Sequence, residues 1–111
     1  MKLTSKNFSE LSEVVGDNPG CEFEGGFVAI KTIKGSFLVE KDGKPVLGVT
    51  PDNEVVVIPE ENSTSVRYRI NQFLPESVKL TSKSGVLMLN GEALKKYNMV
   101  SSDGEVLMSD D

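Results

Sequence analysis

The sequence predicts a mainly β fold, namely a small antiparallel barrel or sandwich with an N-terminal amphipathic helix and a short C-terminal helix. Three observations support this class. Short runs of β-branched and apolar residues recur at intervals of about ten residues, and turn-forming residues separate them. One helical pattern precedes these runs. The 111 residues, 38% of them hydrophobic, suit a single domain spanning 1–111 with its own core.

The first predicted element is an amphipathic helix over residues 1–16. Phe8, Leu11 and Val15 recur at helical spacing, which places their side chains on one face. Gly16 can end the helix, because glycine readily adopts the left-handed conformation that follows many helices. We therefore expect these three apolar residues to anchor the helix on the core.

Residues 21–109 are predicted to form a β meander. Asp42-Gly43, the segment 82–85 and Asp103-Gly104 each separate two apolar runs and predict hairpins, since tight turns need residues that tolerate positive φ. The expected strands cover 27–33, 37–41, 45–49, 55–58, 66–73, 78–81, 86–89, 99–100 and 106–108.

The end of the chain carries the second helical candidate. Residues 92–97 are predicted to form a short helix with Ala93, Leu94 and Tyr97 on its inner side. Residues 110–111 are expected to be a frayed tail, because terminal residues without packing partners are poorly ordered.

The candidate binding residues lie on one predicted strand and its neighbour. Arg67 and Arg69 are the only arginines in the chain, and strict alternation would place both guanidinium groups on one strand face. Guanidinium groups bind phosphate and carboxylate through two parallel hydrogen bonds, so with Lys79 or Lys31 on a neighbouring strand they predict an anion-binding patch. Tyr68 lies between them in sequence, on the opposite face of such a strand. The alternative is a solvated face, salt-bridged to acidic residues of neighbouring strands.

The composition excludes several catalytic chemistries. The chain has no histidine and one cysteine, so histidine-activated nucleophiles and thiolate zinc sites lack their residues. The glycines form neither a dinucleotide-binding fingerprint nor a phosphate-binding loop. Glu22 and Glu24 would share a strand face, but acids two residues apart are common on exposed strands. We therefore expect a protein that is not an enzyme and that carries no metal and no cofactor.

The net charge of −5, from 17 acidic and 12 basic residues, argues against nucleic acid and anionic membranes as partners. Both of these partners are bound mainly through basic residues. No apolar run approaches the roughly 20 residues that span a bilayer. The start of the sequence shows no charged-then-apolar leader, and cysteine is scarce, so we expect a cytoplasmic location.

The expected function is a non-enzymatic binding module, a small acidic protein-interaction domain such as an inhibitor or accessory protein of a phage or mobile element. Two alternatives stay open. One is a self-associating structural protein of the virion or tail type, which would form homo-oligomers. The other is a β-barrel that captures a small anionic ligand, such as a nucleotide, through Arg67 and Arg69.

Overall fold

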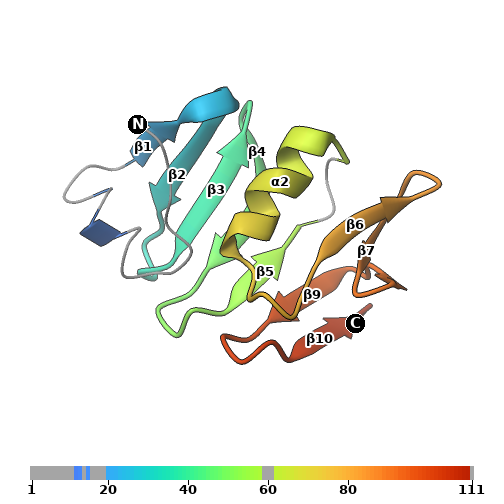
Figure 1. The fold of residues 1–111 in the computed structure, drawn as a ribbon. Coiled ribbons are helices and arrows are strands. Elements are labelled where there is room, and N and C mark those ends of the chain that lie inside the picture. Colours follow the sequence, from blue (N-terminus) through green and yellow to red (C-terminus); the bar gives the residue numbers. More distant parts are fainter. Residues whose placement is uncertain (1–11, 14, 16–19, 59–61, 111) are drawn as a thin grey trace.

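The computed structural model describes residues 12–13, 15, 20–58 and 62–110, which form a mainly β, antiparallel structure (Figure 1). Within these residues, ten strands form one sheet of seven strands and one sheet of three. Helix α2 spans Thr64–Phe73. The mainly β class predicted from the sequence is confirmed.

The seven-stranded sheet has the strand order β1-β2-β3-β4-β5-β9-β10. Its first five strands follow one another along the chain as an antiparallel meander, in which the short 3-10 turn Glu24–Gly26 joins β1 to β2. The next position is taken by β9, which pairs with β5 although a long segment separates the two in sequence. The strand bounds, in sheet order, are Gly20–Phe23, Phe27–Lys31, Phe37–Lys41, Lys44–Val49, Val55–Val57, Tyr97–Val100 and Val106–Ser109.

The segment between β5 and β9 forms a second layer. It contains α2 and the three-stranded antiparallel sheet of β6 (Leu80–Lys83), β7 (Val86–Leu89) and β8 (Glu92–Ala93). Figure 1 shows α2 in front of the large sheet, with β6 and β7 beside the helix. Asn71 of α2 accepts a hydrogen bond from the Leu80 N–H (2.8 Å) and donates one to the Leu80 carbonyl (2.9 Å). The helix is thus joined to β6 by the two bonds that a neighbouring strand would make.

The hydrophobic core lies between the two layers. Successive side chains along a strand point to opposite faces of the sheet. In β2, β3 and β5, the alternate apolar side chains that point toward the second layer are buried, and the side chains on the other face are partly buried or exposed. The helix contributes Val66, Ile70 and Phe73, whose spacing places them on one helical face. The buried strand residues are Phe27, Ala29, Phe37, Val39, Val46, Leu47, Val49, Val55, Val57, Leu80, Leu87, Leu89 and Val100.

The three predicted hairpins are confirmed. Asp42 and Gly43 have φ of 51° and 82°, and Ser84 and Gly85 have φ of 53° and 82°. Two consecutive positive φ angles match the twist of the flanking strands, so these turns join β3 to β4 and β6 to β7. The turn between β9 and β10 contains Gly104, whose φ of 88° lies in the left-handed region.

The prediction of a strand over 66–73 is wrong, because these residues lie in α2. Val66 and Ile70 fit an alternating strand, but they are four residues apart and fit one face of a helix equally well. Ser63 favours the helix, since its side chain accepts a hydrogen bond from the Val66 N–H (3.3 Å) as the N-cap.

The prediction of a short helix over 92–97 is also wrong. This segment contains β8, a loop and the first residue of β9. Asn90 and Gly91, at φ of 49° and 82°, turn the chain back so that β8 pairs with β7. The Asn98 side chain then binds the Lys95 backbone, accepting from its N–H (2.7 Å) and donating to its carbonyl (2.8 Å), so these groups are not available to a helix.

The prediction of a small barrel or sandwich does not describe this arrangement: within the described residues, the large sheet is not closed and ends at β1 and at β10. The layer opposite it is a helix with a small sheet, whereas a sandwich would place a second sheet alone there. Most of the predicted helix 1–16 and residue 111 of the predicted tail lie outside the described residues. Ser12, Glu13 and Val15 are helical, and Val15 is fully buried in the core. No helix in the described part of the chain is long and apolar enough to cross a membrane.

Candidate functional site

The two arginines singled out from the sequence do not share a strand face, because residues two apart on a helix point about 200° away from each other. Arg67 donates hydrogen bonds to the Asn62 Oδ1 and to the Thr64 Oγ1, the latter at 3.3 Å. Asn62 also donates to the Gly85 carbonyl (3.0 Å), so Arg67 lies beside the β6–β7 hairpin.

Arg69 extends in another direction, toward the first strands of the large sheet. It donates to the Gln72 Oε1 at 2.9 Å, and its guanidinium carbon lies 4.9 Å from the centre of the Phe27 ring. The Lys41 ammonium lies at the same distance from this ring and donates to the Gly25 carbonyl at 2.7 Å. Arg69 therefore contributes to packing α2 over β2, since a cation over an aromatic face is attractive.

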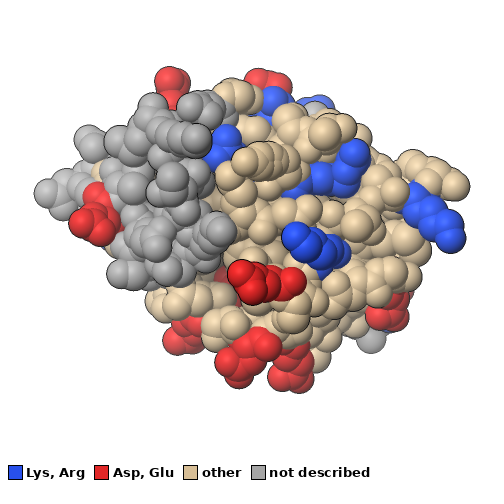
Figure 2. All heavy atoms as spheres, viewed as in Figure 1, with Lys and Arg blue, Asp and Glu red and all other residues tan. Residues whose placement is uncertain are grey.

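The other two predicted residues are on the surface. Tyr68 is 60% exposed on α2, and the exposed Lys79 precedes β6, where its backbone N–H donates to the Asn90 Oδ1 (3.0 Å). Figure 2 shows basic side chains over the region of α2 and the β6–β7 hairpin, and acidic side chains along the lower edge. An anion-binding role for Arg67, Arg69, Lys79 and Tyr68 stays a prediction.

A different candidate lies on the outer face, by which we mean the face of the seven-stranded sheet that points away from α2. The strand register aligns Leu38, Gly48, Val56, Met99 and Leu107 as directly opposite neighbours across β3, β4, β5, β9 and β10. Directly opposite side chains on one sheet face contact each other. The outer face thus carries a row of apolar side chains, interrupted by Gly48, that ends at β10.

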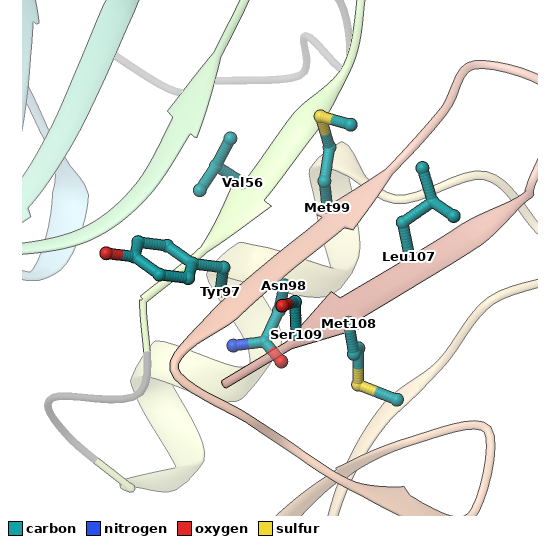
Figure 3. Close-up of a pocket in the computed structure, with 7 residues that line it drawn as sticks. All are labelled: Val56, Tyr97, Asn98, Met99, Leu107, Met108 and Ser109. Atoms are coloured by element: carbon teal, nitrogen blue, oxygen red, sulfur yellow. The ribbon is translucent and has the colours of Figure 1, made fainter. Parts of the chain in front are cut away.

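An apolar pocket of about 420 Å³ lies at the β10 end of this row (Figure 3). Figure 3 shows Val56, Met99 and Leu107 on one side of the strands, whereas Asn98 and Met108 point to the other side. Tyr97 and Leu107 are 52% and 55% exposed, which is unusual for two large apolar side chains on paired strands. The residues lining the pocket are Val56, Tyr97, Asn98, Met99, Leu107, Met108 and Ser109.

The polar groups around this pocket are few. The Asn98 amide is used inside the fold, where it also donates to the Val57 carbonyl at 3.3 Å. The Lys96 ammonium lies 5.4 Å from the centre of the Tyr97 ring, at one end of the pocket. Glu105 lies two residues before Leu107, so alternation places it on the outer face at the other end.

The pocket adjoins an open sheet edge. β10 pairs with β9 on one side and, among the described residues, is the last strand of the sheet. Its sequence, Val106-Leu107-Met108-Ser109, contains none of the lysines or prolines that commonly protect such edges. The register between β9 and β10 is continuous over all four residue pairs, so no bulge protects the edge either.

The arrangement offers apolar surface and main-chain hydrogen-bonding groups, and these are suited to binding. In the described part of the chain, no three Cys, Asp or Glu side chains are grouped so as to hold a metal ion. Comparison of the chain with protein families, with curated proteins and with solved structures found no match. The functional proposal therefore rests on the geometry of this pocket and edge.

Sequence reasoning did not single out this pocket: strands over 55–58, 99–100 and 106–108 were predicted, but Tyr97 was placed in a helix. Val56 becomes a neighbour of Met99 only through the pairing of β5 with β9, which the sequence pattern does not reveal. One signal was present: residues 106–108 are apolar on both faces of a predicted strand. An apolar outer side chain on an edge strand suggests a surface that a partner covers.

Proposed function

We propose that the chain is a non-enzymatic protein-interaction domain that binds its partner on the outer face at β5, β9 and β10. The observation that carries the proposal is the apolar pocket of about 420 Å³ beside the open edge of β10. A pocket of this size with few polar groups suits a bulky hydrophobic side chain of a partner better than a charged metabolite.

Tyr97 and Leu107 support this proposal because they are exposed at 52% and 55% on adjacent strands. Burying such side chains in a complex removes apolar surface from water, and tyrosine is enriched among residues that dominate binding energy. The biological role that we propose for such a small acidic domain, with a net charge of −5, is an inhibitor or accessory protein of a phage or mobile element, acting in the cytoplasm.

The proposal is tested by quantitative affinity capture from source cells with three proteins: the wild type, Leu107→Asp and Ile33→Asp. Ile33 is the matched control, because it is a fully exposed apolar residue in the β2–β3 turn, several strands away from the pocket. We expect a protein that the wild type and Ile33→Asp retain and that Leu107→Asp loses, since a carboxylate would be desolvated in an apolar contact.

Identical capture by all three proteins would contradict a binding role for the outer face. Sedimentation velocity on the same proteins distinguishes the alternative of a self-associating structural protein. In that case the wild type and Ile33→Asp would form oligomers with rising concentration and Leu107→Asp would remain monomeric.

A further inference from the structure

We infer that β10 binds an extended segment of another protein as an added strand, and that this segment carries apolar residues at alternate positions, flanked by lysine or arginine. This inference rests on the function proposed above and specifies the chemistry of the partner. Three independent features of β10 support it: its main-chain groups, its side chains and the charges at its two ends.

The main-chain groups follow from the register of the last hairpin. The Ser101 N–H donates to the Glu105 carbonyl at 2.8 Å, so this pair is a hydrogen-bonded pair of the ladder. Hydrogen-bonded and non-hydrogen-bonded pairs alternate in antiparallel strands. Leu107 therefore bonds to β9, whereas the N–H and carbonyl groups of Val106 and Met108 point to the open edge. An extended segment can satisfy all four of these groups as the next strand.

The side chains define the pattern that the segment must carry. A strand added to β10 lies about 4.8 Å from it, and its side chains alternate between the two faces. A residue that points to the outer face lies beside Leu107 and extends the apolar row of Val56 and Met99 by one strand. The residue two positions along points the same way. Two apolar residues at this spacing would cover Leu107 and the mouth of the pocket.

All charged residues within 101–110, the segment that contains β10, are acidic, whereas Lys96 belongs to the loop before β9. Glu105 immediately precedes the strand and Asp110 immediately follows it, and both are exposed. Asp103 lies in the adjoining turn, and residues 101–110 contain no lysine or arginine. The Asp110 carboxylate accepts a hydrogen bond from the Lys96 backbone N–H at 3.2 Å, which holds it next to the sheet. A segment with basic residues on both sides of its apolar centre is complementary to this edge.

The same charges disfavour a second copy of this chain as the occupant. Antiparallel pairing of two β10 strands brings the Glu105 end of each copy to the Asp110 end of the other, so carboxylates accumulate at both ends of the ladder. Like charges across paired strands are destabilising. A basic-flanked segment of a different protein avoids this repulsion.

The experiment is selection of a phage-displayed random-peptide library on the immobilised wild-type protein, with removal of phage that bind Leu107→Asp. We expect enriched peptides with apolar residues at alternate positions between lysines or arginines. Their binding, measured by fluorescence anisotropy, should weaken by at least about tenfold for Leu107→Asp and for peptides whose basic residues are replaced by glutamate. Ile33→Asp should bind as the wild type does.

Strand addition is tested on the wild-type protein itself by amide hydrogen exchange. A bound peptide should slow the exchange of Val106 and Met108 N–H, because these groups gain hydrogen bonds, and should change that of Leu107 little. Met108→Pro removes one of these N–H groups without breaking a bond to β9, since proline is tolerated where the N–H faces outward. It should abolish binding. If the variant unfolds, the exchange result on the wild type still decides.

Two outcomes would overturn the inference and leave the proposed function standing. One is a set of Leu107-dependent peptides with helical spacing or without basic residues. The other is unchanged exchange of Val106 and Met108 in the complex. If removal of the phage that bind Leu107→Asp leaves no enriched peptide, the inference and the proposed function are both wrong. A wild-type dimer that Leu107→Asp dissociates would make a second copy the occupant.

Discussion

Three asparagine side chains supply hydrogen bonds where the backbone lacks a partner. Asn71 joins α2 to β6, Asn90 joins the β7–β8 turn to the segment before β6, and Asn98 joins β9 to β5 and to the preceding loop. An amide can donate and accept at once, so it imitates a peptide group of a neighbouring strand. At the residue scale, these contacts hold irregular segments against regular ones.

Asn98→Ala is expected to lower the free energy of unfolding by about 2 kcal/mol, because the Val57 carbonyl loses a buried hydrogen bond and the Lys95 backbone loses two part-buried ones. Asn98 is 1% exposed and bonds to the Val57 carbonyl and to both backbone groups of Lys95. Urea unfolding followed by circular dichroism measures the loss. Ser102→Ala, in the exposed β9–β10 turn, is the control and should change stability by less than about 0.5 kcal/mol. A loss that small for Asn98→Ala would mean that these bonds contribute little.

At the scale of the element, α2 depends on a cap that its own sequence provides. Ser63 is the N-cap, and the first turn of the helix contains no acidic residue. The positive end of the helix dipole is therefore not matched by a negative side chain within that turn. This leaves room for a substitution that preserves the cap and improves the electrostatics.

Ser63→Ala is expected to destabilise the protein by about 1 kcal/mol, since the Val66 N–H loses its acceptor. Ser63→Asp is the matched variant: it retains an acceptor oxygen and adds a negative charge at the helix start, so its stability should equal or exceed that of the wild type. Thermal unfolding of the three proteins measures the order. If Ser63→Asp is as unstable as Ser63→Ala, the cap does not explain the effect.

Hairpins whose turns have favoured turn residues could be predicted from the sequence. A segment whose apolar residues fit both the two-residue period of a strand and the 3.6-residue period of a helix could not. Asp42-Gly43 identifies its hairpin because both residues adopt positive φ readily. The pattern of Val66, Tyr68 and Ile70 fits a strand and a helix alike, and burial of Ile70 and Phe73 shows which face is used. The signal that could have resolved it was the cap at Ser63.

A second local signal was available in the segment predicted as a helix. Asn90-Gly91 is the most favoured sequence for a tight hairpin turn, and it directly precedes β8. The helix prediction depends on Ala93, Leu94 and Tyr97 sharing one helical face, although a stretch this short makes a marginal helix. Turn chemistry therefore outweighed propensity at this end of the chain.

At the scale of the whole molecule, the position of each strand in the large sheet determines how well its backbone is protected. β3 and β4 are paired on both sides and carry the buried Phe37, Val39, Leu47 and Val49. β10 is paired on one side only. Amide hydrogens whose hydrogen bonds break only when the whole protein unfolds exchange slowest with solvent. Amide hydrogens at an unpaired edge exchange through local fluctuations.

Hydrogen exchange followed by NMR is therefore expected to be slowest in β3 and β4 and fast at Val106 and Met108. Leu107 is the control within the same strand, since its N–H bonds to β9 and should exchange more slowly than its two neighbours. Equal rates at all three positions would mean that β10 is not held in this register.

The candidate site illustrates why a function was harder to predict than a fold class. Its two exposed residues, Tyr97 and Leu107, belong to one hairpin, but the pocket also needs Val56 from a strand that is distant in sequence. The anion-binding hypothesis for Arg67 and Arg69 depended on a strand, and α2 separates their side chains. Long-range strand pairing, which no single segment reports, decides the first result, and a local choice between strand and helix decides the second.

The pairing of β5 with β9 has a consequence for biosynthesis. The first five strands and the second layer leave the ribosome before β9 does, because chains emerge from the N-terminal end. Until β9 arrives, Val55–Val57 is the unprotected border of a nascent sheet. A nascent chain that stalls before β9 is thus expected to recruit chaperones at β5, and the pairing of β9 with β5 then places this strand in the interior of the sheet.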